Sequence, residues 1–430
     1  MDTTIATGIW QKSKLLVKGG LIAILVLFLM ITAHFVQELV TEREARQKEA
    51  FNEVSSKWAG RQNITGPVLV LPYNETVTTG DGKAGFVKKQ AYVLPDQLEI
   101  HSTVSPEQRH RGIFQVMLYT SSIQLKGKFN AIPFRSLDLD PSMVLWNEAY
   151  VCMGLEDSKG LKEEIRLNWN DSASTLSPEA VNNGVMKEGF TSPISVMPDQ
   201  QVNFSANISV NGSRQLLFTP VGKETTVTLS SAWPDPSFTG GALPDHRITD
   251  SGFVATWRSL AHTRSFPQAW KETSYDLSSA SFGADLFIPV NGYQKTMRSV
   301  KYAVLCILLT FAAFFIIESV SRKSVHPFQY ALIGLALILF YTLLLSISEY
   351  LSFNTAYIIA SFATVGLIAW FVKGILHSSR MTTIMTLVLV LMYSYIFSIL
   401  QLQDYSLLLG SIGLFLTLGV IMHFSKKIQW

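Results

Sequence analysis

The chain has 430 residues, enough for two or three domains, and only 16% of them are charged, against about 25% in soluble proteins. A hydrophobic fraction of 48%, with only 2 Cys and 27 Gly, excludes disordered, disulfide-rich and collagen-like chains. The formal net charge of +3 is too small to indicate nucleic-acid binding, because that requires a concentrated basic face.

Charged residues are distributed unevenly along the chain. Residues 42–297 contain 24 Lys+Arg and 27 Asp+Glu, whereas the remaining 174 residues contain only 11 and 5. The first composition is that of an ordinary soluble protein, and the second is typical of membrane-spanning segments. The sequence therefore predicts a soluble part that is flanked by membrane parts.

Six apolar segments are long enough to cross about 30 Å of hydrocarbon as helices. The first covers 15–37, after a short N-terminus of residues 1–14. It should remain as an anchor, because bulky groups stand where a signal peptidase needs small ones. A Glu-, Arg- and Ala-rich stretch then predicts a helical lead-in to about residue 59. The other five lie in a domain of residues 298–425, before a short tail of 426–430, and cover about 300–320, 328–347, 354–373, 381–400 and 405–424.

The orientation follows from the basic residues beside these segments, which stay on the cytoplasmic side. One side of the predicted bundle carries Lys12, Lys14, Lys18, Arg322, Lys323, Lys373, Arg380, Lys426 and Lys427. The short loops on the other side carry Glu349 and Asp404 and no base. We therefore expect both termini in the cytoplasm and residues 38–297 outside it. Arg298 and Lys301 are exceptions, but the rule is weak beside a long translocated domain.

The large external part is predicted to be mainly β. Residues 201–210 alternate apolar and polar side chains, as a half-buried strand does, and Asn211-Gly212 predicts a turn after them. The expected fold is therefore a bundle of six transmembrane helices with a mainly-β domain inserted between the first and second, built as an antiparallel sandwich or as two β-subdomains. Further strands are expected at 68–72, 89–94, 97–104, 113–119, 123–129, 225–233, 252–257 and 285–290.

Motifs for catalysis or cofactors are absent from the sequence. Residues 80–85 match G-x-G-x-x-G, but no helix start follows, so we interpret them as a hairpin loop. We expect no enzyme activity, no cofactor and no metal. Ionisable groups are also missing from the centres of the last five segments, which disfavours ion-coupled transport. Glu318, near Arg322, and Glu349 lie at helix ends, where an anchoring or ion-pair role competes with a binding role.

Several stretches resemble the CreD family of bacterial inner-membrane proteins. The resemblance extends over nearly the whole chain in the same order, with one departure at Tyr350, where the family more often has His. It implies a periplasmic location for residues 38–297 and a link to cell-envelope integrity and to the response controlled by the Cre two-component system. The stretches that carry it include 66–72, Trp233-Pro-Asp-Pro-Ser-Phe238, 252–257, 298–318, His326-Pro-Phe-Gln-Tyr330 and 340–349.

Three functional hypotheses follow. The first is a non-enzymatic protein whose β-domain contacts periplasmic partners or envelope components, with Trp233, Asp235 and Phe238 as candidate contacts unless they belong to the core. The second is a transporter or lipid-handling protein with a groove between the second and third helices. The third, weaker hypothesis is an envelope-modifying enzyme. The candidate positions in the membrane part are Glu318, His326, Tyr330, Tyr341, Ser348 and Glu349, of which Glu318, Tyr330, Tyr341 and Glu349 would line the groove. The expected partners are the lipid bilayer and periplasmic or envelope components, and no nucleic acid is expected.

Overall fold

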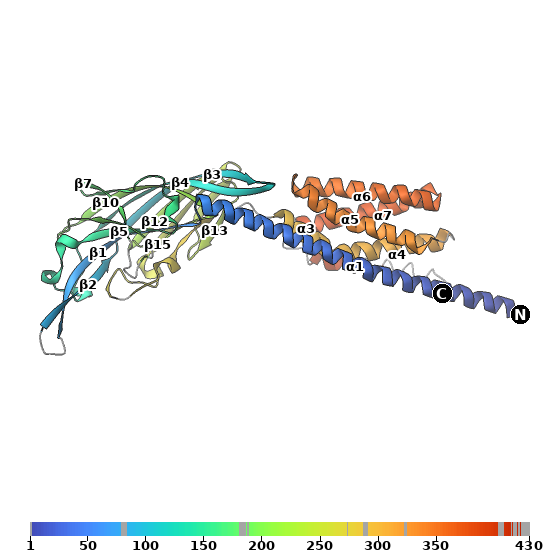
Figure 1. Cartoon of the computed structure of the whole chain (residues 1–430), viewed down its shortest axis with the longest axis horizontal. Coiled ribbons are helices and arrows are strands. Elements are labelled where there is room, and N and C mark those ends of the chain that lie inside the picture. Colours follow the sequence, from blue (N-terminus) through green and yellow to red (C-terminus); the bar gives the residue numbers. More distant parts are fainter. Residues whose placement is uncertain are drawn as a thin grey trace. The chain divides into compact units, whose positions relative to one another are not determined.

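A computed structural model describes residues 2–78, 84–179, 186, 189–272, 274–286, 291–321, 325–402, 408–413, 415, 419 and 422. The chain divides into two compact units (Figure 1). The helical unit consists of Met1–Glu49 and Pro289–Trp430, and the β unit consists of Ala50–Ile288. The predicted placement of residues 38–297 outside the cytoplasm stays a prediction.

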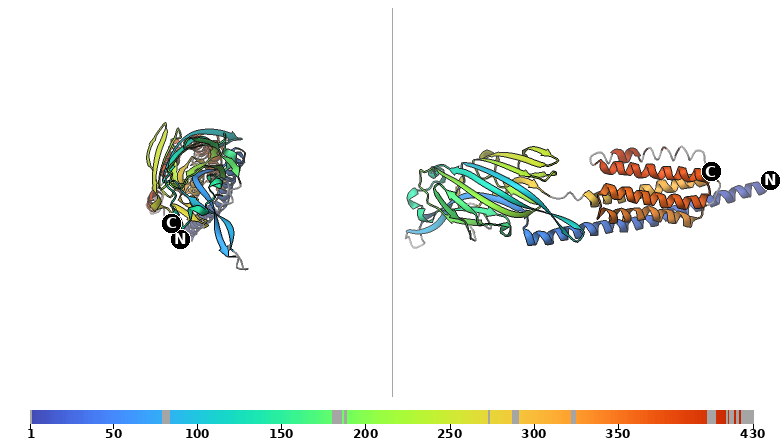
Figure 2. Two further views of the ribbon diagram at one scale, coloured as in Figure 1. Left: turned by 90° about the vertical axis from the view of Figure 1, so that its left-hand side faces the viewer. Right: turned by 90° about the horizontal axis from the view of Figure 1, so that it is seen from above.

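Apolar helices dominate the helical unit, in which α5, α6 and α7 lie side by side (Figure 2). Four described helices are long and apolar enough to cross a membrane, and a fifth crossing results if one bent helix pair counts as a single span. The sixth predicted helix, 405–424, lies mostly outside the described residues. The helices are α1 (Asp2–Trp58), α3 (Asn291–Lys301), α4 (Ala303–Ser321), α5 (Pro327–Ser348), α6 (Phe353–Leu376) and α7 (Ser379–Gln401).

The predicted helix at 300–320 is broken near its start. Helix α3 ends at Lys301, α4 begins at Ala303, and the two are bent by 43°. The sequence of α3 is polar, whereas α4 is almost entirely apolar. The apolar segment was found correctly, but the preceding amphipathic helix was missed because it lies at the edge of a sequence that appeared soluble.

Helix α1 contacts the other helices of its unit through its apolar residues. Leu29 is 2% exposed and lies over Gly334 of α5. A Cβ atom on Gly334 would collide with the Leu29 side chain and would stand 3.0 Å from the ring of Phe311 on α4. Glycine is therefore required for the close approach of α1, α4 and α5 at this point.

The β unit contains two sheets. One has the order β13-β17-β11-β1-β5-β9-β8, with β2 and β16 attached through β1, and the other has the order β14-β15-β12-β3-β4-β10-β6-β7. Their strands are β1 (Gln62–Thr78), β2 (Ala84–Val93), β3 (Gln97–Arg111), β4 (Phe114–Phe129), β5 (Tyr150–Leu155), β6 (Arg166–Trp169), β7 (Ser172–Thr175), β8 (Ser177–Glu179), β9 (Gly189–Pro193), β10 (Val202–Ser213), β11 (Gln215–Phe218), β12 (Glu224–Ser231), β13 (Ser237–Gly240), β14 (Asp245–Thr249), β15 (Gly252–Leu260), β16 (Ala269–Lys271) and β17 (Phe282–Asp285).

Both sheets contribute to one hydrophobic core. Trp257 of β15 stacks on Phe282 of β17 with ring centroids 5.6 Å apart, which links one sheet to the other. In β10 the alternate residues from Val202 to Val210 are buried, as their period-2 pattern predicts. The unit is a two-sheet arrangement rather than two subdomains, and most strand pairs are antiparallel. The pairs β1–β11 and β3–β12 are parallel, a detail that strand patterns do not reveal.

Two local predictions differ from the structure. Asn211-Gly212 is not a turn, because β10 continues to Ser213 and pairs with β4 throughout. Gly212 instead provides room for the ring of Tyr119, its partner on β4, which a Cβ atom would overlap. The strand expected at 285–290 already ends at Asp285, and residues 287–290 lie outside those described.

Candidate functional site

Glu318 lies in a polar cluster where α1, α4 and α5 meet. Its carboxylate accepts hydrogen bonds from the Tyr330 hydroxyl at 2.9 Å and from the Val325 N–H at 3.0 Å, and it pairs with Lys18 of α1. Lys18 also donates to the Val325 carbonyl at 2.7 Å. The Lys18 and Glu318 side chains are only 18% and 12% exposed. The cluster therefore joins three helices through a largely buried ion pair. The predicted partner Arg322 lies outside the described residues.

Glu349 is the centre of a second cluster with the same kinds of group. It caps the C-terminus of α5, accepts a hydrogen bond from the Tyr293 hydroxyl of α3 at 3.2 Å and stands 3.6 Å from Nε of Arg43 on α1. Its side chain is 8% exposed. Lys18 and Arg43 are 25 residues apart, about 37 Å along a helix. This distance lies between the thickness of the hydrocarbon layer and that of a whole bilayer.

Tyr341 lies within an aromatic cluster between these two ends. Its hydroxyl donates to Sγ of Cys306 on α4 at 3.3 Å, and its ring packs on that of Phe340. Nearby, the Tyr357 hydroxyl of α6 donates to the carbonyl of Tyr393 on α7 at 2.9 Å. Tyr341 and Tyr330 thus each bond α5 to α4. The side chains proposed for a groove are buried in helix–helix contacts.

His326 and Ser348 lie at the two ends of α5. The ring of His326 accepts a hydrogen bond from the Phe328 N–H at 3.2 Å, and Gln329 accepts one from the His326 N–H at 3.0 Å, which forms a capping box. The Ser348 hydroxyl donates to the carbonyl of Leu345 at 2.9 Å. Both side chains satisfy backbone groups at helix ends, which otherwise lack partners.

Trp233, Asp235 and Phe238 lie together in the β unit but point to different surroundings. The Trp233 indole donates to the Asp235 carbonyl at 2.9 Å, and Trp233 is partly buried against the core. Phe238 packs edge-on against Phe253 and Trp257. Of the three candidate contacts, Asp235 alone has an exposed side chain.

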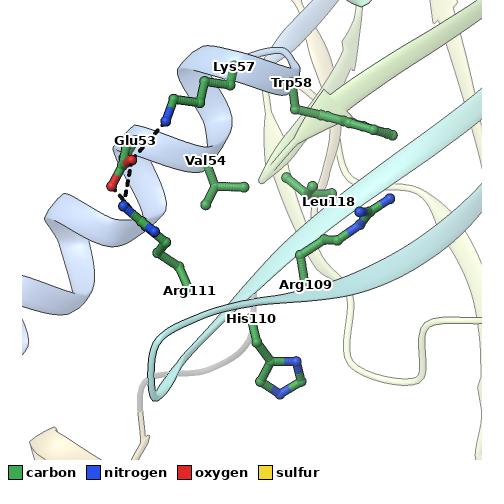
Figure 3. A pocket seen from close by; sticks show the side chains of 8 residues that line it. All are labelled: Glu53, Val54, Lys57, Trp58, Arg109, His110, Arg111 and Leu118. Atoms are coloured by element: carbon green, nitrogen blue, oxygen red, sulfur yellow. Dashed lines mark hydrogen bonds and ion pairs between the residues drawn. The ribbon is translucent and has the colours of Figure 1, made fainter.

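A recess that the sequence did not reveal lies between the end of α1 and the hairpin of β3 and β4 (Figure 3). Its volume is about 270 Å³. It combines an indole ring, two aliphatic side chains and several bases with one carboxylate. The residues that line it are Glu53, Val54, Lys57, Trp58, Arg109, His110, Arg111 and Leu118. We refer to it as the α1–β3 recess.

Ion pairs fix one wall of the α1–β3 recess, as the dashed lines in Figure 3 show. Glu53 accepts from Lys57 at 2.8 Å and from two nitrogens of Arg111 at 3.1 and 2.9 Å. The hydrogen bonds from Lys57 and then Arg111 lower the pKa of Glu53 below its usual value. This carboxylate is shared by two bases, so positive charge remains in excess at the wall.

Arg109 contributes a further cation and an aromatic contact. Its guanidinium carbon stands 5.5 Å from the centroid of the Trp58 ring, within the range of a cation–π interaction, and its Nε donates to Glu107 at 2.7 Å. Bases beside an indole can bind an anionic group that is attached to an apolar or sugar ring. In the sequence, the basic run 109–111 was the one available signal for this recess. Trp58, which completes it, lies about 50 residues earlier in the chain, so no local pattern joins the two.

The described residues include no group of three or more His, Cys, Asp or Glu that could hold a metal ion. The β unit has four histidines, His101, His110, His246 and His262. His110 lines the α1–β3 recess on β3, and His246 lies on the exposed strand β14 with its ring 4.9 Å from that of Phe238.

Comparison with known proteins relates the whole chain to one family. A family model described as inner membrane protein CreD matches residues 14–430. The inner membrane protein CreD of Escherichia coli K12 is 28% identical over 413 residues, which cover 94% of this chain and 91% of that protein. Among solved structures, a candidate nutrient-binding protein of Legionella pneumophila is 7% identical, covers 45% of this chain and 68% of its own, and has a TM-score of 0.22. This similarity is too low to indicate a shared fold or function.

Proposed function

Because the chain belongs to the CreD family of inner membrane proteins, we propose that it supports cell-envelope integrity without catalysing a reaction. In this proposal the β unit lies in the periplasm and binds an envelope component or partner, while the helices hold it at the membrane. The chain crosses the membrane six times, and both termini are cytoplasmic.

Charge at the two ends of the helical unit supports this orientation. Lys18 lies beside Glu318 and Val325, Lys373 lies in the last turn of α6 and Arg380 in the first turn of α7. We assign these bases to the cytoplasmic end, because basic residues beside membrane segments are retained there; the rule is weak for Arg43 and the bases of α3 at the other end, which adjoin the long external segment. Glu349 lies at the opposite end of α5.

The proposed binding role rests on the α1–β3 recess. Three bases line it, and the two carboxylates that pair with them, Glu53 and Glu107, leave an excess of one positive charge, while Trp58 gives it an aromatic surface. Hot spots for binding are enriched in Trp and Arg, and Arg is suited to carboxylate and phosphate groups. The expected ligand is therefore an anionic component of the envelope. Asp235, with Trp233, remains a second candidate contact.

The helical unit supports a holding role better than a transport role. Tyr330 and Tyr341 bond α5 to α4 through Glu318 and Cys306. Glu349 is bonded to α3 and paired with α1. The side chains that would line a transport groove are thus engaged in contacts between helices. The transporter hypothesis is therefore weaker than the hypothesis of a binding protein held at the membrane.

The experiment is complementation of a strain that lacks the protein. A Lys57→Gln/Arg109→Gln variant should be as abundant as the wild type but should fail to restore tolerance of envelope stress. Arg258→Gln/Lys126→Gln is the matched control, because it removes two bases from exposed positions elsewhere in the β unit. Full tolerance with the recess variant would contradict the proposal.

A further inference from the structure

Helix α3 has one buried face and one basic face. Tyr293, Thr296 and Ser299 are buried at 9%, 0% and 0% exposure, whereas Arg298 and Lys301 are exposed. The buried positions recur every three residues, which places them on one side of the helix. A short amphipathic helix of this kind is suited to the membrane–water interface rather than to the hydrocarbon core of the bilayer.

Contacts of α3 place it at one end of the helical unit. Tyr293 bonds to Glu349 at the C-terminus of α5. The ammonium of Lys295 lies 5.7 Å from the ring centroid of Phe353, the first residue of α6, and 3.4 Å from Oε1 of Gln401, the last residue of α7. Three membrane-length helices thus begin or end at the level of α3.

The length of α4 gives the same placement. Its 19 residues span about 28 Å, which by itself matches the hydrocarbon thickness of about 30 Å. The 43° bend separates α3 from this span. The exposed bases of α3 therefore lie at the depth of the lipid headgroups.

The exposed bases of α3 lack a counter-charge among the residues that the structure describes. Lys295 is engaged by Phe353 and Gln401, and neither Arg298 nor Lys301 forms an ion pair with any residue that the structure describes. We propose that Arg298 and Lys301 bind the phosphate of an acidic phospholipid at this end of the bundle.

The chemistry of the two side chains fits this ligand. A guanidinium can donate two parallel hydrogen bonds to the oxygens of one phosphodiester. Lys301, at the junction with α4, can lay its aliphatic stem along the acyl region and raise its ammonium to the headgroup. A zwitterionic lipid offers the same phosphate but adds a cation that these bases repel. Binding therefore prefers phosphatidylglycerol to phosphatidylcholine.

Native mass spectrometry of the purified full-length chain in mild detergent tests the proposal. Phosphatidylglycerol or phosphatidylcholine is added, and the number of lipid molecules retained per protein is measured. The wild type should retain phosphatidylglycerol preferentially, and Arg298→Gln/Lys301→Gln should reduce this preference roughly tenfold. Arg298→Lys should retain most of it because it keeps the charge. Arg247→Gln/Lys126→Gln, which removes two exposed bases from the β unit, should have no effect.

Three results would overturn the proposal. The first is a wild type that shows no preference between the two lipids, and the second is an equal loss in the control pair. The third is displacement of the bound lipid by inorganic phosphate at equimolar concentration, since the site would then recognise free phosphate instead of a lipid headgroup. Both double variants replace exposed side chains, and far-ultraviolet circular dichroism verifies that each keeps its fold.

Discussion

The hydroxyl of Tyr330 donates a hydrogen bond to the carboxylate of Glu318 over 2.9 Å, at the point where Lys18 of α1 pairs with the same carboxylate. Tyr330 is fully buried, and Phe311 and Phe314 pack edge-on against its ring. This bond connects α4 to α5 within a cluster that also includes α1. Glu318 is accordingly a structural group in our account.

Replacement of Glu318 tests this interpretation. Glu318→Gln leaves the ammonium of Lys18 largely buried and without its counter-charge, so it should lower the free energy of unfolding of the helical unit by about 2 kcal/mol. Glu42→Gln is the control, because Glu42 pairs with Arg46 one turn away at 51% exposure, where ion pairs contribute little. Thermal unfolding in detergent compares the two. Unchanged stability with loss of stress tolerance would instead favour a binding role for Glu318.

Two buried threonines should respond oppositely to the same substitution. Thr219 is bonded to Thr65, Ser281 and Asn63, so Thr219→Val should destabilise the β unit by about 1–3 kcal/mol. The hydroxyl of Thr296 is also fully buried but has no hydrogen-bond partner among the described residues. Thr296→Val should therefore be neutral or stabilising for the helical unit. Equal losses at both sites, measured by thermal unfolding, would disagree with these assignments.

Asp285 should make the stability of the β unit depend on pH. Its Oδ1 is buried without a hydrogen bond and stands 4.0 Å from Nε of Arg214, a distance at which the ion pair is weak. Burial raises the pKa of Asp285, and Arg214 opposes this less strongly. Because the folded state holds the proton more tightly than the unfolded chain, stability should fall as pH rises from the ordinary pKa of 3.8 through the raised value.

The substitution Asp285→Asn should remove this dependence and should stabilise the β unit at neutral pH. The unfolding temperature of wild type and variant, measured across the acidic range, provides the comparison. Asp171→Asn serves as a control at an exposed position. A variant that follows the pH profile of the wild type would show that Asp285 is not the responsible group.

Substitutions at Phe238 and Asp235 distinguish a role in core packing from a role in partner binding. Phe238→Ala should cost about 2–3 kcal/mol of stability, because its ring fills the space beside Phe253 and Trp257. Asp235→Ala should change stability by less than about 0.5 kcal/mol. A loss of stress tolerance in Asp235→Ala at normal abundance would support the second candidate contact, and normal tolerance would remove it.

Patterns that repeat along the chain predicted much of the fold. The apolar segments at 328–347, 354–373 and 381–400 correspond to α5, α6 and α7, and the alternation at 201–210 corresponds to β10. Such patterns record which face of an element is buried. They do not record which element covers that face, so the parallel pairing of β1 with β11 was not foreseen.

The functional sites were harder to predict, because they depend on contacts between distant residues. Lys18 and Glu318 are 300 residues apart, and the sequence indicated only the nearer Arg322 as a partner. Asn211-Gly212 has the local signature of a turn, but the packing of Tyr119 determines its conformation. The α1–β3 recess likewise depends on contact between Trp58 and Arg109, and no local sequence motif predicts that contact.

Photocrosslinking from the α1–β3 recess in living cells tests the binding role most directly. A photoreactive amino acid replaces Val54, which lines the recess, and adducts are analysed with and without Lys57→Gln/Arg109→Gln. We expect a light-dependent adduct with a periplasmic or envelope component, and we expect it to be lost when the two bases are removed. No adduct, or one that persists without the bases, would contradict the account.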